Sequence, residues 1–159
     1  MSVPVGARAP EVRSRNQHGE TVSLADLLGS SGRPGPVAPV LLVFYPWAFS
    51  GICTGELAAL RDGHADLAAA GVRVVALSCD AMFTLRAFAK AEDLPFDLLS
   101  DHWPHGAIAR EYGVFDDEAG CALRGSFLLD ASGTVTWSVL NGIGEPRDVL
   151  EHLQVAAGR

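Results

Sequence analysis

The sequence predicts an α/β fold in which a mixed central β-sheet is flanked by helices. Through most of the chain, apolar runs typical of buried strands alternate with segments of helical periodicity. Two further strand-like runs, joined by a short turn, then indicate an antiparallel addition to the sheet. With 159 residues, the chain is expected to form one domain over residues 1–159.

The first expected elements are short. Residues 11–15 and 21–23 have the pattern of a small hairpin, with His18-Gly19 at its turn. Ser is a typical N-cap, so a short helical turn is expected over residues 23–28. Residues 29–39 are rich in Gly and Pro, and we expect them to form a loop that leads into the first long strand.

The alternation of strands and helices begins at residue 40. Strands are expected at 40–45, 72–77 and 96–99, and helices at about 52–70, 82–91 and 104–112. Pro104 fits the first position of its helix, and Pro146 is expected to open a final helix that reaches about Ala156. Residues 124–129 and 134–140 flank a turn and form the expected hairpin. This order is typical of a thioredoxin-like arrangement.

Composition excludes several classes of function. The net charge is −7 and Lys90 is the only lysine, so nucleic-acid and anionic-membrane partners are not expected. The first residues lack the pattern of a signal peptide, and no apolar stretch approaches the ~18 residues that a membrane span needs. Three cysteines without CxxC spacing do not resemble a secreted disulfide framework. A cytoplasmic location is expected.

Cys53 is the strongest candidate for chemistry. It follows the apolar strand at 40–45 and falls in the first turn of the next expected helix. Unpaired backbone N–H groups and the positive end of the helix dipole favour a thiolate at this position. Because the thiolate is the nucleophilic form of cysteine, we expect redox chemistry at this sulfur.

Three neighbours in the sequence support this interpretation. Pro46 lacks an N–H and stiffens the loop before the helix, which would shield the sulfur. Ser50 can offer a hydroxyl to the sulfur or to a bound oxygen. Glu56 lies one helical turn beyond Cys53, where a carboxylate alone would disfavour the thiolate. Glu56 helps only if it orients a cation, and sequence distance does not reveal which cation.

The spacing Pro46-x-x-x-Ser50-x-x-Cys53 resembles the active-site signature of the peroxiredoxins. The similarity extends over nearly the whole chain, and it includes the segments Leu99–Gly106, Tyr112–Phe115 and Arg124–Phe127. Together these segments are most similar to the bacterial AhpE-type, one-cysteine peroxiredoxins.

The resemblance implies a role for each site residue. Cys53 would be the peroxidatic nucleophile, Ser50 would hydrogen-bond the peroxide or the thiolate, and Pro46 would shield the sulfur. Arg124 matches the active-site arginine of the family. Its guanidinium would stabilise the thiolate, and Glu56 would orient that guanidinium.

The resemblance also implies substrates and partners. Hydrogen peroxide and organic hydroperoxides, such as those of fatty acids, would oxidise Cys53 to a sulfenic acid. An external thiol would reduce it: mycothiol with a mycoredoxin, or a thioredoxin-like protein. No metal or organic cofactor is required. Homodimerisation through the active-site end of the fold is the family expectation.

Several alternatives stay open at this point. Cys53 alone would more often be an inert buried thiol, and Arg124 alone a solvated strand-end charge. Cys79 or Cys121 could resolve the sulfenic acid internally, although the one-cysteine interpretation is favoured. His102 and His105 suggest a metal site, but their spacing around Pro104 fits packing and capping better.

Two other functions compete with a peroxidase. A thioredoxin-like disulfide reductase is disfavoured because the sequence that follows Cys53 contains no second cysteine at the required spacing. A redox sensor or binding module, in which Cys53 oxidation alters partner contacts, is the non-enzymatic alternative. Sustained turnover with an added reductant separates a peroxidase from such a sensor.

Overall fold

The computed structural model describes residues 1–32 and 36–158. Its centre is a five-stranded sheet with the strand order β5-β4-β3-β8-β9. The strands are β3 (Val40–Phe44), β4 (Arg73–Ser78), β5 (Asp97–Ser100), β8 (Arg124–Leu129) and β9 (Val135–Asn141). β3, β4 and β5 are parallel, whereas β8 pairs antiparallel with both β3 and β9. The predicted mixed central sheet is therefore confirmed.

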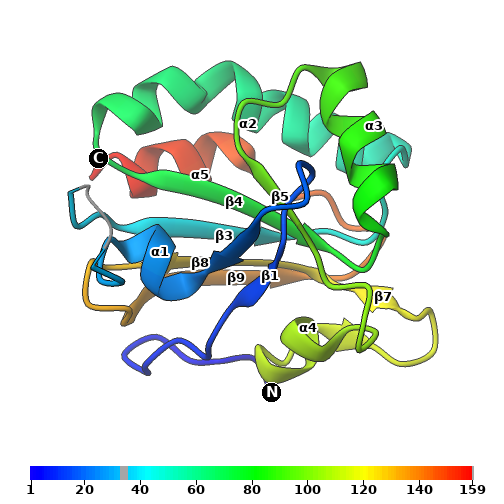
Figure 1. Cartoon of the computed structure of the whole chain (residues 1–159), viewed down its shortest axis with the longest axis horizontal. Helices are drawn as coiled ribbons and strands as arrows, with labels where there is room; N and C mark the ends of the chain where they lie inside the picture. The colour runs from blue at the N-terminus through cyan, green and yellow to red at the C-terminus, as the bar shows by residue number, and fades with distance from the viewer. Residues whose placement is uncertain (33–35, 159) are drawn as a thin grey trace.

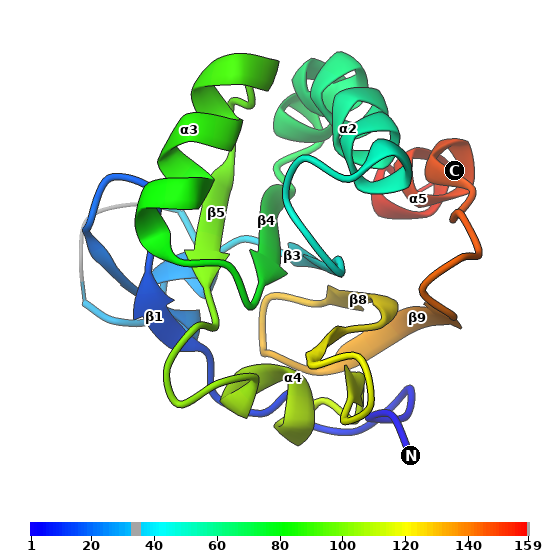
Figure 2. The ribbon, with the colours of Figure 1, turned by 90° about the vertical axis from the view of Figure 1, so that its right-hand side faces the viewer.

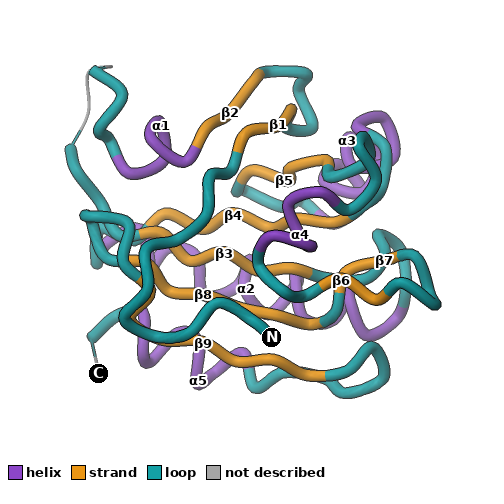
Figure 3. The backbone as a smooth tube through the Cα atoms, turned by 90° about the horizontal axis from the view of Figure 1, so that it is seen from below, coloured by secondary structure: helices purple, strands orange, loops and turns teal. Residues whose placement is uncertain are grey.

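Helices cover both faces of this sheet (Figures 1 and 2). One face carries α2 (Gly51–Ala69), α3 (Met82–Glu92) and α5 (Val149–Ala156). The other carries α1 (Leu24–Leu28), α4 (Ala107–Glu111) and the N-terminal segment, and Figure 3 looks at the molecule from that side. Among the described residues, no helix is both long enough and apolar enough to cross a membrane.

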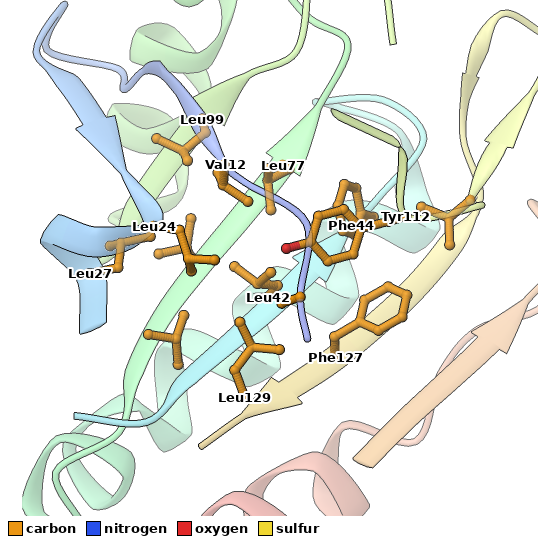
Figure 4. Packing of buried hydrophobic residues seen from close by; sticks show 14 of the residues in the cluster. Val12, Leu24, Leu27, Leu42, Phe44, Leu77, Leu99, Tyr112, Phe127 and Leu129 are labelled. Carbon is orange, nitrogen blue, oxygen red and sulfur yellow. The ribbon is translucent and has the colours of Figure 1, made fainter. Parts of the chain in front are cut away.

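Each face of the sheet has its own hydrophobic core. All five residues of β3 are buried, as expected for a strand covered on both sides. Figure 4 shows the core beneath α1 and α4, where the rings of Phe44, Tyr112 and Phe127 are in contact with one another. The second core lies beneath α2, α3 and α5, and it includes Cys53 and Leu57.

The predicted N-terminal elements are present. The strands β1 (Arg13–Arg15) and β2 (Thr21–Ser23) form an antiparallel hairpin. Ser23 caps α1 by accepting a hydrogen bond from the backbone N–H of Asp26, whose carboxylate accepts one from the Ser23 N–H in return. Of the predicted loop at 29–39, residues 33–35 lie outside the described part of the chain.

The prediction for Pro104 was wrong. α4 begins at Ala107 with Gly106 as its N-cap, so Pro104 lies in the preceding turn rather than at the first helical position. The carboxylate of Asp101 accepts hydrogen bonds from the N–H groups of Ile108 and Ala109, at 3.0 and 2.9 Å. A carboxylate from outside the helix thus satisfies its first donors, so a proline start is unnecessary.

The predicted start of the final helix was also wrong. Its end at Ala156 is correct, but Asp148 is the N-cap and α5 starts at Val149, not at Pro146. The side chain of Asp148 accepts a hydrogen bond from the Glu151 N–H, which fixes this start. The sequence analysis missed a small hairpin between α4 and β8, formed by β6 (Phe115–Asp116) and β7 (Cys121–Ala122).

Candidate active site

Cys53 lies at the end of the sheet where β3 passes into α2, the end that faces the viewer in Figure 2. Ser50 is the N-cap of α2, so Cys53 occupies the third position of the first helical turn. Its side chain is fully buried, and Pro46 in the preceding loop is buried as well. The apolar strand and the loop therefore hold the sulfur at the positive end of the α2 dipole.

Arg124 reaches this sulfur from β8, the strand that lies next to β3 in the sheet. β8 runs antiparallel to β3, so its first residue lies beside the carboxyl end of β3. The Nη1 atom of Arg124 lies 3.3 Å from Cys53 Sγ and 2.6 Å from Glu56 Oε1. The Nε atom donates to the carbonyl of Ile143 at 2.7 Å, which fixes the plane of the guanidinium. Arg124 is 2% exposed, so water does not screen these contacts.

Glu56 also binds a second arginine, which the sequence analysis did not identify. Arg147 donates from Nε to Glu56 Oε2 at 3.0 Å and from Nη2 to Glu56 Oε1 at 2.9 Å. Its backbone N–H donates to Glu56 Oε2 at 2.7 Å. Such a two-pronged contact specifies orientation as well as charge. Arg147 therefore holds the carboxylate that in turn contacts Arg124.

The buried cluster carries one uncompensated positive charge, because two guanidinium groups share one carboxylate. Burial alone would raise the pKa of the Glu56 carboxyl. The hydrogen bonds and charge of Arg147, together with the charge of Arg124, instead lower this pKa below its ordinary value. Glu56 is thus ionised at neutral pH. A thiolate at Cys53 would bring the total charge of the cluster to zero.

Two buried hydroxyl groups in the described structure, those of Ser50 and Tyr45, have no hydrogen-bond partner. Ser50 does not cap α2 with its side chain, so its hydroxyl is free to bind a ligand. The hydroxyl of Tyr45 lies near that of Ser78 without hydrogen-bond geometry, and burial raises the pKa of Tyr45 above its ordinary range. Tyr45 directly precedes Pro46, the first residue of the motif, and this adjacency was the sequence signal that could have placed it near the site.

Asp80 fixes the loop that leads to Cys53. Its Oδ2 atom accepts hydrogen bonds from the backbone N–H of Ala48 at 2.8 Å and from the hydroxyl of Ser78 at 2.7 Å. The carbonyl of Asp80 accepts a hydrogen bond from the Ser100 hydroxyl at 2.6 Å. The ends of β4 and β5 therefore determine the path of the Pro46–Ser50 loop.

Cys79 and Cys121 lie in a different electrostatic setting from Cys53. Both are buried and free. Burial raises the pKa of Cys79 to about 12, with Asp101 as the next contribution. Burial also raises the pKa of Cys121 to about 11, with Asp116 next, although Arg124 acts in the opposite direction. Both thiols are therefore protonated at neutral pH.

His102 and His105 make local contacts. A ring nitrogen of His105 lies 2.7 Å from the carbonyl of Gly120, and one of His102 lies 3.4 Å from the carbonyl of Cys79. Within residues 1–32 and 36–158, no group of three or more His, Cys, Asp or Glu side chains is arranged to hold a metal ion. Each histidine thus lies against a backbone carbonyl outside the helices.

Comparisons with known proteins show the family to which this chain belongs. The AhpC/TSA family model matches residues 5–138. The chain belongs to this family. It is 40% identical over 144 residues to alkyl hydroperoxide reductase E of Mycobacterium tuberculosis, covering 91% of this chain and 90% of that protein. It is 30% identical to the chloroplastic 2-Cys peroxiredoxin BAS1 of Hordeum vulgare, covering 94% and 72% of the two chains.

A solved structure agrees with the fold of this peroxiredoxin. Enterococcus faecalis AhpC superposes with a TM-score of 0.86 at 25% identity, covering 99% of this chain and 92% of that one. The predicted thioredoxin-like fold is therefore confirmed, as is the recognition of an AhpE-like peroxiredoxin. Like its relatives, the chain is a peroxidase of the oxidoreductase class, and such enzymes use peroxides and thiol reductants.

Proposed function

We propose that Cys53 reduces hydrogen peroxide and organic hydroperoxides and becomes a sulfenic acid. The observation that carries the proposal is the 3.3 Å contact between Arg124 Nη1 and the buried Cys53 sulfur. That contact belongs to a cluster with one excess positive charge, which a thiolate would neutralise. A buried anion facing a directed cation is the arrangement expected for an activated cysteine.

The proposed reaction begins with the thiolate attacking the terminal peroxide oxygen. The sulfur supplies an electron pair, an S–O bond forms and the O–O bond breaks. Cys53 is thereby oxidised to the sulfenic acid, and the departing oxygen takes a proton from water, equal to the one that the thiol released on ionising, and leaves as water or an alcohol. The free Ser50 hydroxyl can donate to a peroxide oxygen, and Arg124 can stabilise the charge that develops on it.

Each remaining site residue supports this step. Pro46 is buried in the loop that precedes the nucleophile, which fits a shielding role. Glu56 contacts both arginines, so it would orient Arg124 toward the sulfur. Arg147 has no contact with Cys53, and its proposed role is to position Glu56.

Alkyl and fatty-acid hydroperoxides are included because the segment around Cys53 exposes large apolar side chains. Trp47 is 42% exposed and Phe49 is 54% exposed, and both lie in the loop that precedes the nucleophile. Ile52, next to Cys53, is 37% exposed. These side chains can contact an alkyl tail. The name of the mycobacterial relative, alkyl hydroperoxide reductase E, agrees with this substrate class.

We further propose that an external thiol reduces the sulfenic acid, either mycothiol with a mycoredoxin or a thioredoxin-like protein. Cys79 and Cys121 are poor internal resolving groups because both are buried and carry raised pKa values. The free state of all three cysteines suits a reducing compartment such as the cytoplasm. Residues 1–159 would act as a single domain.

A homodimer is proposed through the active-site end of the fold. Large apolar side chains are exposed there, in the segments that follow β3, β4 and β5. They belong to Trp47, Phe49, Phe83 and Trp103. Trp103 is 85% exposed, so it does not belong to the core. Exposed apolar side chains of this size are typical of a protein contact.

The experiment mixes reduced protein with one equivalent of peroxide and follows intact mass and free thiols. We expect a gain of one oxygen within seconds at Cys53, and no such gain in Cys53→Ser. The controls are Cys79→Ser and Cys121→Ser, which should react like the parent protein. A loss of two hydrogens would contradict the one-cysteine mechanism. If Cys53 reacts no faster than a free thiol, the peroxidase proposal fails, and oxidation without turnover would identify a sensor.

A further inference from the structure

A chain of buried polar groups continues beyond Arg147 and away from Cys53. Arg147 Nη1 donates to the carbonyl of Gly125 and to the hydroxyl of Ser126, both at 3.0 Å. The same hydroxyl lies 2.8 Å from Nε2 of His152 in α5. The other ring nitrogen, Nδ1, lies 2.8 Å from the carbonyl of Asp148. Ser126 is fully buried and His152 is 2% exposed.

The chemistry of these groups determines the direction of each hydrogen bond. A carbonyl only accepts, so Nδ1 of His152 must carry the proton that binds the Asp148 carbonyl. In the neutral imidazole, Nε2 is then an acceptor, and the Ser126 hydroxyl donates to it. The Ser126 oxygen keeps its lone pairs for the guanidinium of Arg147. The backbone of α5 therefore selects one tautomer and one hydroxyl orientation.

The chain ends at the nucleophile. Arg147 holds both oxygens of Glu56, Glu56 contacts Arg124, and Arg124 contacts the sulfur of Cys53. Every member of the chain is buried. In a setting of low dielectric constant, each hydrogen bond is strong and a misplaced partner is costly.

We propose that neutral His152 is a positioning residue for the Cys53 site, acting through Ser126 and Arg147, and that protonation of His152 disturbs the site. This inference concerns the site of the proposed peroxidase and deepens that function by adding a form of pH control. The ring of His152 hydrogen-bonds with Ser126 and the Asp148 carbonyl and not with Cys53, so its effect passes through the arginine that holds Glu56.

Protonation would reverse the role of Nε2. An imidazolium donates from both nitrogens, so the Ser126 oxygen would have to accept from His152 and Arg147 at once. Within the described structure, the Ser126 hydroxyl has no other acceptor for its own proton. A second cation would also face Arg147 across one hydroxyl group. The contact between Ser126 and Arg147 would weaken as a result.

Some groups around His152 lower the pKa of its imidazole and others raise it. Burial lowers the pKa of His152, the hydrogen bond to Asp148 opposes this shift, and the charge of Arg147 adds to it. The carboxylates of Glu56 and Asp148 also favour the charged form. The neighbour from β9, Trp137, is an uncharged ring with its centroid 4.8 Å away. The net effect is a pKa below the ordinary histidine value.

The sign of the pH effect follows from this lowered pKa. Below about pH 6.5, the unfolded chain gains a proton at His152 before the folded protein does. The stability that neutral His152 contributes is therefore complete above about pH 6.5 and declines as the pH falls toward the folded pKa. The hydrogen bonds that position the Cys53 site should weaken once the folded protein itself binds that proton at His152.

The test measures the rate at which iodoacetamide alkylates Cys53, in a Cys79→Ser, Cys121→Ser background. His152→Leu removes the acceptor, and its rate near neutral pH should fall about fivefold, the factor that one net hydrogen bond of ordinary strength gives. His152→Gln can accept from Ser126 but cannot titrate, so it should keep the parent rate. Leu153→Ala is the matched control, because Leu153 packs α5 against Gly63 without joining the polar chain.

Two comparisons decide the outcome. If Leu153→Ala lowers the melting temperature as much as His152→Leu and also slows alkylation equally, His152 is only structural and the proposal is overturned. The ratio of the parent rate to the His152→Gln rate should fall as the pH is lowered from about 7.5 through the folded pKa of His152, which lies below the ordinary histidine value. A constant ratio would overturn the pH control.

A double-mutant cycle tests the route through Ser126. In a Ser126→Ala background, His152→Leu should cause no further loss of rate, since the link is already broken. An additive loss would overturn this route. Alkylation requires no peroxide, so these results stand even if the peroxidase proposal fails, and the two failures are distinguishable.

Discussion

The three cysteines offer a comparison between two buried regions of the molecule, one around Cys53 and one around Cys79 and Cys121. Cys53 and Cys121 are both fully excluded from solvent, and Cys79 is 6% exposed. Around Cys79 and Cys121, burial is joined by the carboxylates Asp101 and Asp116, and both thiols are held protonated. Around Cys53, the contact is a guanidinium. Burial together with a nearby carboxylate therefore keeps a thiol protonated, and a directed cation distinguishes the cysteine that is proposed for redox chemistry.

The cation at Cys53 itself depends on a partner of opposite charge. Two arginines within a core would repel each other and lose hydration, and Glu56 offsets both costs by contacting each of them. The region around Cys79 and Cys121 needs no such arrangement because its thiols carry no charge. Substitutions that weaken the cluster around Cys53, while leaving the surroundings of Cys79 and Cys121 intact, test this difference.

The largest effect is expected from Glu56→Gln. This change leaves two buried guanidinium groups without a carboxylate, and removing one partner of a buried ion pair costs about 3–5 kcal/mol of stability. Urea unfolding near neutral pH measures the loss. Because the pKa of Glu56 is lowered in the folded protein, the difference from the parent protein should disappear as the pH falls through that pKa, below about 4.5. A difference that persists in acid would contradict the ionic explanation.

A loss of reactivity without general unfolding is expected from Arg124→Met. Methionine keeps part of the side-chain volume but removes the donor that contacts Cys53 Sγ. Hydrogen bonds to charged groups contribute about 1.5–3 kcal/mol, so alkylation and peroxide oxidation of Cys53 should slow about 10- to 150-fold. Cys53 would then behave like Cys79 and Cys121.

The matched control for that substitution is Arg110→Met. Arg110 is an exposed arginine paired with Asp117 on the surface, so its loss should leave the Cys53 rate unchanged. Equal slowing in both variants would show that the contact with the sulfur is not the cause.

The smallest effects on stability and on the Cys53 rate are expected from substitutions of Cys79 and Cys121. Cys79→Ala and Cys121→Ala each remove one small buried group, so each should lower the free energy of unfolding by about 1 kcal/mol. Neither should change the rate of Cys53 oxidation by more than about twofold. Stopped-flow oxidation and urea unfolding measure the two quantities. A large loss of rate in either variant would assign that cysteine to the reaction and erase the distinction between the regions.

Much of the fold could be predicted because its signals are local. The apolar run of β3, the periodicity of α2 and the Ser23 cap of α1 all depend on neighbours in the sequence. The start of α4 could not be predicted from Pro104, since Asp101 caps that helix from outside it. The hairpin of β6 and β7 is too short for periodicity to reveal.

The residues of the candidate site also divide into those with a signal in the sequence and those without one. Cys53, Ser50 and Pro46 form a motif with fixed spacing, and the resemblance to a family added Arg124. Arg147 had no comparable signal, because its contact with Glu56 joins residues 91 positions apart through a loop. Chemical roles for all of these residues stay predictions until the rates are measured.

The separation between Glu56 and Arg147 also has a consequence for the order of events during synthesis. Cys53 leaves the ribosome long before Arg147, whose backbone and side chain both bind Glu56. A nascent chain that ends before this residue has the cysteine and the helix but not the second guanidinium. The proposed reactive site is therefore completed only when the segment before α5 folds against α2.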